Sequence, residues 1–145
     1  MNYLNRNITQ ELEQSIETRP LTYLNGGRQV GKSTLCSHLP DNIKRNHITF
    51  DSPLVLATAK SQPAAFVDSL PNEILNIIDE VQFAPEIFPY LKIKIDSNRL
   101  NGNDKQKFLL TGSANLMAMP KLSEALVGRM SVLTLYPFSA SEYYN

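Results

Sequence analysis

Eight consecutive residues, Gly26 to Ser33, have types and a spacing that can hold a nucleotide phosphate. They read Gly-Gly-Arg-Gln-Val-Gly-Lys-Ser and satisfy the pattern G-x-x-x-x-G-K-[ST]. Glycines in such a loop let consecutive backbone N–H groups face the phosphate oxygens. Lys32 would place its charge between the β- and γ-phosphates, and the Ser33 hydroxyl would be a ligand of Mg²⁺. The predicted nucleotide-binding residues are Gly26, Gly27, Arg28, Gln29, Val30, Gly31, Lys32, Ser33 and Thr34.

An acidic pair, Asp79 and Glu80, follows the apolar run 74–78. A carboxylate at the tip of a strand beside a phosphate loop can hold Mg²⁺ through a water molecule, which is the role expected of Asp79. A second carboxylate can orient and deprotonate the water that attacks the γ-phosphate, which is the role expected of Glu80. An acidic pair also fits a strand end that merely meets solvent. With the phosphate loop present, the pair favours hydrolysis over transfer to a small molecule.

The elements that would position these residues alternate along the chain. An apolar residue at every fourth position predicts a helix over about 3–18. The phosphate loop joins a short strand, 21–24, to a helix that begins near Lys32. Further strands are expected at 46–50, 74–78, 107–111 and 131–135, with helical segments after Pro63 and through 116–126. Alternating strands and helices predict a three-layer α/β/α domain with a mostly parallel five-stranded sheet.

The segment 91–96, Leu-Lys-Ile-Lys-Ile-Asp, is ambiguous in pattern. Its strict alternation favours a half-exposed strand, whereas Ile87, Leu91 and Ile95 have helical spacing and Pro85 suits a helix start. The polar run 98–106 that follows predicts a surface loop.

The composition excludes several other classes of protein. Its 145 residues are 42% apolar and 19% charged, as expected of one globular domain, and 14 basic residues balance 14 acidic ones. The net charge of the chain therefore does not indicate binding to nucleic acid or to an anionic membrane. Cys36 is the only cysteine and is expected in the core, while His38 and His47 have no evident partners and are expected on the surface. Without a membrane span or a signal peptide, the sequence predicts a cytoplasmic protein.

Five segments together resemble a known family. Gly-Gly-Arg-Gln-Val-Gly-Lys-Ser, Ile-Ile-Asp-Glu-Val-Gln, Leu-Leu-Thr-Gly-Ser, Gly-Arg and Leu-Tyr-Pro-Phe-Ser-Ala-Ser-Glu resemble, in this order, the AAA-type domain of a widespread group of prokaryotic P-loop ATPases. The resemblance implies the AAA+ core sheet, in which the strand of Leu109 lies between the phosphate-loop strand and the Asp79 strand. It also implies a helix over 91–96. The implied organisation is an N-terminal helix (1–19) and an ATPase core (20–145), with a C-terminal domain beyond.

The resemblance also implies roles for residues near the end of the chain. Thr111 and Ser113 end the inserted strand, where such ATPases keep a polar sensor of the γ-phosphate; Ser113 is preferred, and Asn115 is a third candidate. A polar turn that caps the next helix fits these residues equally well. Arg129 matches the region that supplies an arginine to a nucleotide, often across a subunit boundary, although a simple salt bridge is the alternative. Gly27 departs from the proline common in the family.

The sequence therefore predicts Mg²⁺-dependent ATP hydrolysis. The expected catalytic residues are Glu80, Lys32, Ser113 and Arg129, and the expected metal-binding residues are Ser33 and Asp79. Adenine is expected because no Asn-Lys-x-Asp motif follows the loop. The alternatives are a nucleotide-binding switch with little hydrolysis and, third, a small-molecule kinase. Expected partners are a second copy, through Arg129, and a protein or nucleic acid bound by the C-terminal domain.

Overall fold

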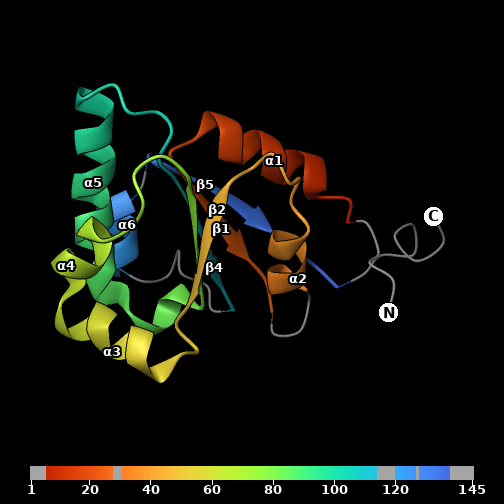
Figure 1. The fold of residues 1–145 in the computed structure, drawn as a ribbon. Helices are drawn as coiled ribbons and strands as arrows, with labels where there is room; N and C mark the ends of the chain where they lie inside the picture. Colours follow the sequence, from red (N-terminus) through yellow and green to blue (C-terminus); the bar gives the residue numbers. More distant parts are fainter. Residues whose placement is uncertain (1–5, 28–30, 114–119, 127, 138–145) are drawn as a thin grey trace.

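Five parallel strands form one sheet in the order β2-β3-β4-β1-β5. The computed structural model of the chain describes residues 6–27, 31–113, 120–126 and 128–137 (Figure 1). The strands are β1 (Leu21–Asn25), β2 (Arg45–Thr49), β3 (Leu75–Asp79), β4 (Lys107–Gly112) and β5 (Met130–Thr134). Strand β4 lies between β1 and β3, as the family resemblance implied.

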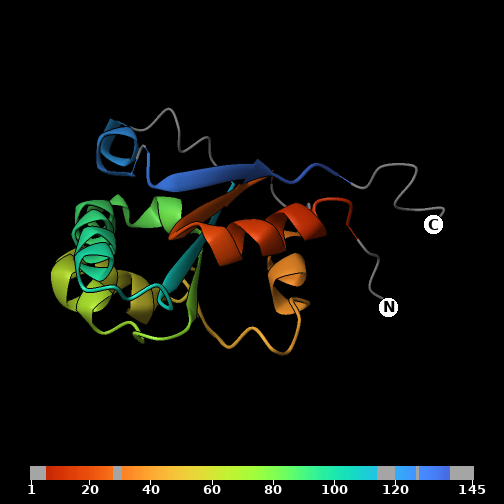
Figure 2. The ribbon, with the colours of Figure 1, turned by 90° about the horizontal axis from the view of Figure 1, so that it is seen from above.

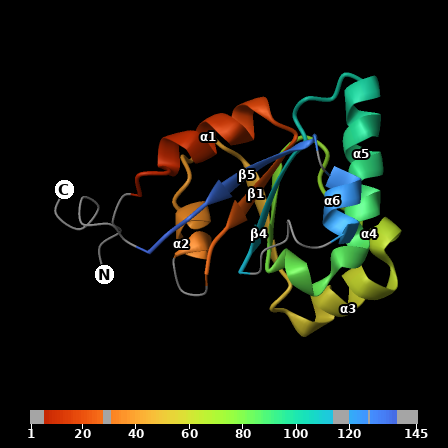
Figure 3. The same cartoon turned by 180° about the vertical axis from the view of Figure 1, so that it is seen from behind.

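Helices cover both faces of the sheet, which gives the three-layer α/β/α architecture (Figures 1 and 2). One face carries α1 (Thr9–Thr18) and α2 (Lys32–Ser37). The other face carries α3 (Pro53–Ser61), α4 (Pro63–Asp68), α5 (Phe88–Leu100) and α6 (Pro120–Leu126), as Figure 3 also shows. Two short 3₁₀ helices, η1 (Val81–Phe83) and η2 (Pro85–Ile87), connect β3 to α5. The predicted fold class is confirmed.

The segment 91–96 is helical and lies within α5. In a strand, Leu91, Ile93 and Ile95 would share one face. In the structure Leu91 and Ile95 are buried, together with Phe88, while Ile93 is 62% exposed. The buried positions therefore follow the helical period, and the alternation of apolar and charged residues does not reflect a strand.

Several predicted boundaries are shifted. Helix α1 begins at Thr9 instead of near residue 3, because residues 6–8 form a turn in which Thr9 Oγ1 donates a hydrogen bond to the carbonyl of Arg6. Helix α5 continues to Leu100, so the first residues of the predicted loop 98–106 are helical. Residues 3–5 and 116–119, which fall in predicted helices, lie outside the described part of the chain.

The parallel arrangement brings the carboxyl ends of all five strands to one edge of the sheet. The register pairs Asn25 with Gly112 and Thr49 with Asp79. These strand ends and the residues that follow them are therefore neighbours in space, and they include the phosphate loop and the acidic pair. Within the described residues, no helix is long and apolar enough to cross a bilayer. Cys36 is fully buried, as expected.

Candidate nucleotide-binding site

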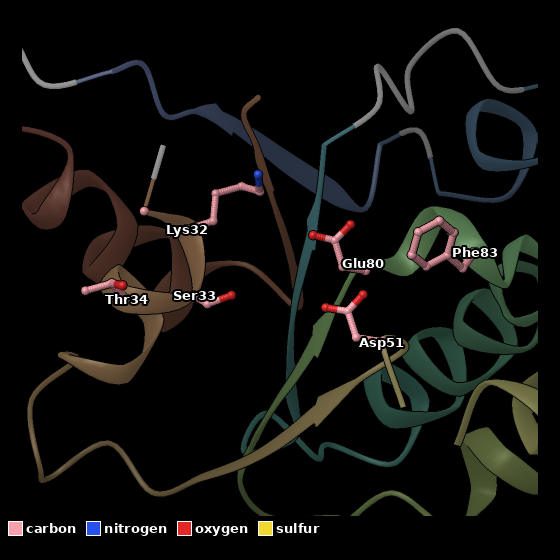
Figure 4. A pocket seen from close by; sticks show the side chains of 7 residues that line it. Lys32, Ser33, Thr34, Asp51, Glu80 and Phe83 are labelled. Atoms are coloured by element: carbon pink, nitrogen blue, oxygen red, sulfur yellow. The ribbon is translucent and has the colours of Figure 1, made fainter. Parts of the chain in front are cut away.

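A cleft of about 470 Å³ opens at this edge of the sheet (Figure 4). Lys32 and Ser33, at the start of α2, lie on one side of it, and the carboxylates of Asp51 and Glu80 lie on the other. The cleft is lined by Gly31, Lys32, Ser33, Thr34, Asp51, Glu80 and Phe83. The structure thus brings together the predicted binding residues at the end of the loop and the predicted catalytic carboxylate. Residues 28–30 lie outside the described part of the chain.

Lys32 is folded back over the beginning of the phosphate loop. Its Nζ donates hydrogen bonds to the carbonyl oxygens of Gly26 (2.8 Å) and Gly27 (2.9 Å). Burial lowers the pKa of Lys32, and the negative charges of Glu80 and Asp79 oppose that effect. Gly31, which precedes Lys32, has φ +96°, a conformation that glycine adopts without a steric penalty. The loop therefore needs glycine at this position for its backbone conformation.

The carboxylate of Asp79, at the end of β3, is buried among polar groups from neighbouring elements. The Thr111 hydroxyl donates to Oδ1 (2.7 Å), and Ser33 Oγ lies 3.5 Å from Oδ2. His47 Nε2, from β2, also contacts Oδ2. The expectation that His47 has no partner is therefore wrong, because the register of β2 against β3 places its ring beside the strand end. His38 is exposed, as expected, but the expectation that it has no partner is also wrong, because its Nδ1 lies 2.9 Å from the carbonyl oxygen of Thr34.

Glu80 has an unusual backbone conformation, with φ 57° and ψ 44°. It is the one non-glycine residue with positive φ in the described part of the chain. This conformation costs on the order of 1 kcal/mol and turns the chain sharply from β3 into η1. The Glu80 side chain accepts a hydrogen bond of 2.6 Å from Gln82 Nε2. Burial and the nearby charge of Glu80 raise the pKa of Tyr23 above its ordinary value.

The candidate sensor residues occupy different surroundings. Thr111 is buried, and its hydroxyl donates a hydrogen bond to Asp79. Ser113 is half-buried beyond the end of β4, and its Oγ accepts a hydrogen bond of 3.3 Å from Gln82 Nε2. Asn115 lies outside the described residues. Ser113 is thus connected to Glu80 through one side chain, whereas Thr111 is connected to the predicted metal ligand.

Arg129 does not join the cleft of its own chain. It forms a two-pronged ion pair with Asp96 of α5, with N–O distances of 2.7 and 3.0 Å. The register of β1 against β5 places Arg129 beyond the Leu21 end of β1, whereas the phosphate loop follows Asn25. At about 3.3 Å per residue, the two positions are roughly 17 Å apart along the strand. Arg129 therefore cannot reach a nucleotide held by its own phosphate loop.

Four residues at or beside the cleft were not among those predicted from the sequence. Asp51 and Phe83 line it, Gln82 binds Glu80, and His47 contacts Asp79. Asp51 follows β2 by two residues, so the strand-end argument that identified Asp79 would also have found Asp51. Gln82 ends the quoted segment Ile-Ile-Asp-Glu-Val-Gln, but no role followed from its type, because its contacts depend on the sharp turn at Glu80.

The donor set fits a magnesium ion. Ser33 Oγ and Asp79 Oδ2 are hard oxygen atoms that lie 3.5 Å apart at the mouth of the phosphate loop. Mg²⁺ prefers such ligands and usually keeps several of its waters. Among the described residues there is no cluster of three or more acidic, histidine or cysteine side chains that could hold a metal by themselves.

A parallel sheet in this order, with a glycine-rich loop between β1 and α2 and an acidic pair at the end of β3, defines a P-loop nucleotide-binding domain. Residues 18–144 match the family described as AAA domain. The chain belongs to this family, which confirms the resemblance of its motifs and implies nucleotide binding.

Two relatives with similar sequences are mycobacterial. Uncharacterized protein Rv2008c of Mycobacterium tuberculosis and uncharacterized protein Mb2031c of Mycobacterium bovis are each 29% identical to the chain over 130 residues. The match covers 90% of this chain and 28% of each relative. The chain therefore spans less than a third of their length.

Similar solved structures include three with related folds. The Walker-type ATPase PABY2304 of Pyrococcus abyssi has a TM-score of 0.64 at 20% identity, and the match covers 97% of this chain and 55% of that one. Cdc6p of Pyrobaculum aerophilum has a TM-score of 0.63 at 12% identity, covering 97% and 49%. PCH-2 of Caenorhabditis elegans has a TM-score of 0.59 at 17% identity, covering 93% and 44%. At these identities the likeness concerns the fold.

Proposed function

We propose that this domain binds ATP with Mg²⁺ and hydrolyses it. The observation that carries the proposal is the cleft itself, in which Glu80 lies across from Lys32 and Ser33 (Figure 4). A triphosphate held by the loop would direct its γ-phosphate toward the side of the cleft that carries Glu80. That is where a base must lie to take a proton from an attacking water.

Each side chain would have a separate task in this reaction. Lys32 would exchange its bonds to the Gly26 and Gly27 carbonyls for bonds to phosphate oxygens. Ser33, with Asp79 through water, would hold Mg²⁺, which neutralises charge on the β- and γ-phosphates. Glu80 would accept a proton from the water as its oxygen attacks the γ-phosphorus and the bond to the β-phosphate oxygen breaks. The products are ADP and inorganic phosphate.

The test compares ATP binding with ATP turnover in three variants. We expect Lys32→Ala to weaken ATP binding by at least about tenfold, because a charge-assisted contact to phosphate is lost. We expect Glu80→Gln to bind ATP within about twofold of wild type but to lose about 10²- to 10⁴-fold in kcat, the usual contribution of a general base. Glu11→Gln, at an exposed position on α1, is the control and should match wild type. Equal turnover by wild type and Glu80→Gln would refute the catalytic assignment.

A second copy of the chain would complete the site through Arg129. The support for this part of the proposal is that Arg129 lies at the opposite end of the strands from its own phosphate loop. We expect Lys32→Ala and Arg129→Ala to be poorly active alone and to regain turnover when mixed, because one supplies an intact arginine and the other an intact loop. Turnover by Arg129→Ala that equals wild type at every protein concentration would contradict this part.

The alternative function is a nucleotide-binding switch that hydrolyses ATP slowly. It is favoured by the internal hydrogen bonds of Lys32 and Glu80, which give the free site a stable arrangement of its own. A switch would bind ATP with no change in kcat between wild type and Glu80→Gln. The same three variants therefore distinguish a switch from an ATPase.

A further inference from the structure

One amide group connects Glu80 to Ser113. Gln82 Nε2 donates to Glu80 Oε2 at 2.6 Å and to Ser113 Oγ at 3.3 Å. Gln82 belongs to η1, directly after the turn at Glu80, whereas Ser113 lies just beyond the end of β4. The Gln82 side chain thus connects the ends of β3 and β4. It does so by binding Glu80 and Ser113, the two residues expected to act on the γ-phosphate.

The orientation of the Gln82 amide is determined by its neighbours. An ionised carboxylate can only accept hydrogen bonds, so the NH₂ group must face Glu80. The carbonyl oxygen Oε1 is consequently directed elsewhere, and it is buried without a hydrogen-bond partner in the described part of the chain. Buried oxygen atoms without partners are uncommon in native proteins. The hydrogen bond from Gln82 to Glu80 is therefore made although it leaves Gln82 Oε1 without a hydrogen-bond partner.

Gly112 makes room for this arrangement. A Cβ at Gly112 would lie 2.8 Å from Gln82 Oε1 and 2.8 Å from the Tyr23 hydroxyl. Gly112 does not have a positive φ, so its backbone conformation is open to any residue. The need for glycine here is steric, and one of the two groups that require it is the Gln82 amide.

We propose that Gln82 is a positioning residue that holds the Glu80 carboxylate and couples it to Ser113. A γ-phosphate that contacts Ser113 changes the hydrogen bonding of its hydroxyl, and Gln82 carries that change to the base. The inference deepens the proposed function and rests on it. It assigns to Gln82 an effect on the hydrolytic step and none on the affinity for ATP, because the Gln82 side chain is not part of the phosphate loop.

The first test separates kcat from binding. We expect Gln82→Ala to lower kcat about tenfold to 10²-fold, the range in which small misplacements of catalytic groups reduce rates, with the Kd for ATP within about twofold of wild type. Gln82→Glu has nearly the same shape but cannot donate to a carboxylate when ionised, so it should lower kcat at least as much. Gln14→Ala, at an exposed position on α1, is the matched control. Wild-type kcat in Gln82→Ala, or a loss confined to Kd, would overturn the inference.

Double variants test whether the residues act as one unit. If Gln82 and Ser113 form one chain, Ser113→Ala combined with Gln82→Ala should be no slower than the slower single variant. Gly112→Ala should lower kcat in the wild-type background. Once Gln82 is alanine, the part of this effect that comes from Gln82 Oε1 should vanish, and only the part that comes from the Tyr23 hydroxyl should remain. Effects on kcat that multiply in the Gln82 and Ser113 pair would show independent action and overturn the coupling.

A spectroscopic measurement tests the coupling without turnover. The side-chain NH₂ signal of Gln82 in a ¹⁵N-labelled protein is assigned by its loss in Gln82→Glu. We expect a non-hydrolysable ATP analogue with Mg²⁺ to shift this signal in wild type, and to shift it less in Ser113→Ala at saturation. An analogue that binds without shifting the signal overturns the role of Gln82 but leaves the proposed function intact. An analogue that does not bind overturns the proposed function as well.

Discussion

The carboxylate of Asp79 is held from two sides before any ligand arrives. Thr111 donates to one oxygen from β4, and His47 and Ser33 lie against the other from β2 and α2. Asp79 is 4% exposed, so its oxygen atoms depend on these neighbours for hydrogen bonds. Strands β2 and β4 lie on either side of β3, and this places His47 and Thr111 beside the Asp79 carboxylate.

Thr111→Val should show how much the buried carboxylate depends on its neighbour. Valine has nearly the same shape as threonine but leaves Asp79 Oδ1 without its donor. We expect the free energy of unfolding to fall by about 1–3 kcal/mol, the usual cost of a buried group without its partner. Urea denaturation measures the change, and Thr58→Val, at an exposed position on α3, should stay within about 0.5 kcal/mol of wild type. A Thr111→Val protein as stable as wild type would show that Asp79 does not need this bond.

The residues that could be predicted from the sequence are those whose role follows from their own chemistry. Lys32 and Ser33 belong to a pattern whose fixed positions each have a chemical task, and Glu80 follows a strand that ends beside this loop. Gln82 and His47 could not be predicted, because their contacts depend on a sharp turn and on a strand register. Neither is encoded by the types of adjacent residues.

At the scale of elements, the helices are defined by the faces that they bury. Helix α1 buries Leu12 and Ile16 against the face of the sheet that also carries α2. Ser15 and Thr22 share a hydrogen bond of 2.6 Å between α1 and β1. The apolar period predicted α1 correctly but placed its start too early, because a period shows which face is buried and not where the helix begins. In helix α5 the apolar pattern was misleading in another way. Its exposed Ile93 completes an apolar–charged alternation that is typical of a strand, although the segment is helical.

Leu12→Ala tests whether α1 is an integral part of the core. Leu12 is fully buried, so its truncation leaves a cavity, and we expect a loss of about 2–5 kcal/mol in the free energy of unfolding. Leu100→Ala, at the 88% exposed end of α5, is the matched control and should change stability by less than about 0.5 kcal/mol. Equal stability of the two variants would mean that α1 is not packed on the sheet.

At the scale of the whole molecule, Cys36 reports on opening of the fold. Its thiol is fully buried on α2, and burial, with a smaller contribution from the charge of Asp79, raises its pKa to about 12. The thiolate is the reactive form, so the native protein should be nearly inert to thiol reagents at pH 8. Any labelling must then pass through an opened state in which the thiol has its ordinary pKa.

We expect saturating ATP to slow the labelling of Cys36 in proportion to the stability that binding adds, about 10²-fold at 100 times Kd. Lys32→Ala should lose this protection at the same ATP concentration. Labelling followed with a chromogenic disulfide reagent measures both rates. Rapid labelling of the native protein at pH 8, unaffected by urea, would show that the thiol is accessible in the folded state.

The raised pKa of Cys36 also makes the stability dependent on pH. Below about pH 8.5 the thiol is protonated in both states, and its contribution is constant. Above that value the unfolded thiol ionises while the native one does not, so stability should fall as the pH rises toward 12. Denaturation of wild type and Cys36→Ala between pH 8 and 10 measures the difference, and parallel curves would contradict the expectation.

The order of the strands has a consequence for synthesis of the chain. Strand β1, which leads into the phosphate loop, has no partner among the strands that immediately follow it, because Leu21 pairs with Phe108 and Met130. A ribosome that adds roughly 5–20 residues per second therefore exposes this apolar strand for roughly 4–17 s before β4 is made. During that interval β2 and β3 can pair with each other, but β1 and its loop have no sheet to join. The nucleotide site is thus among the last parts of the nascent domain to form, and a bound nucleotide would stabilise only chains that already include β4.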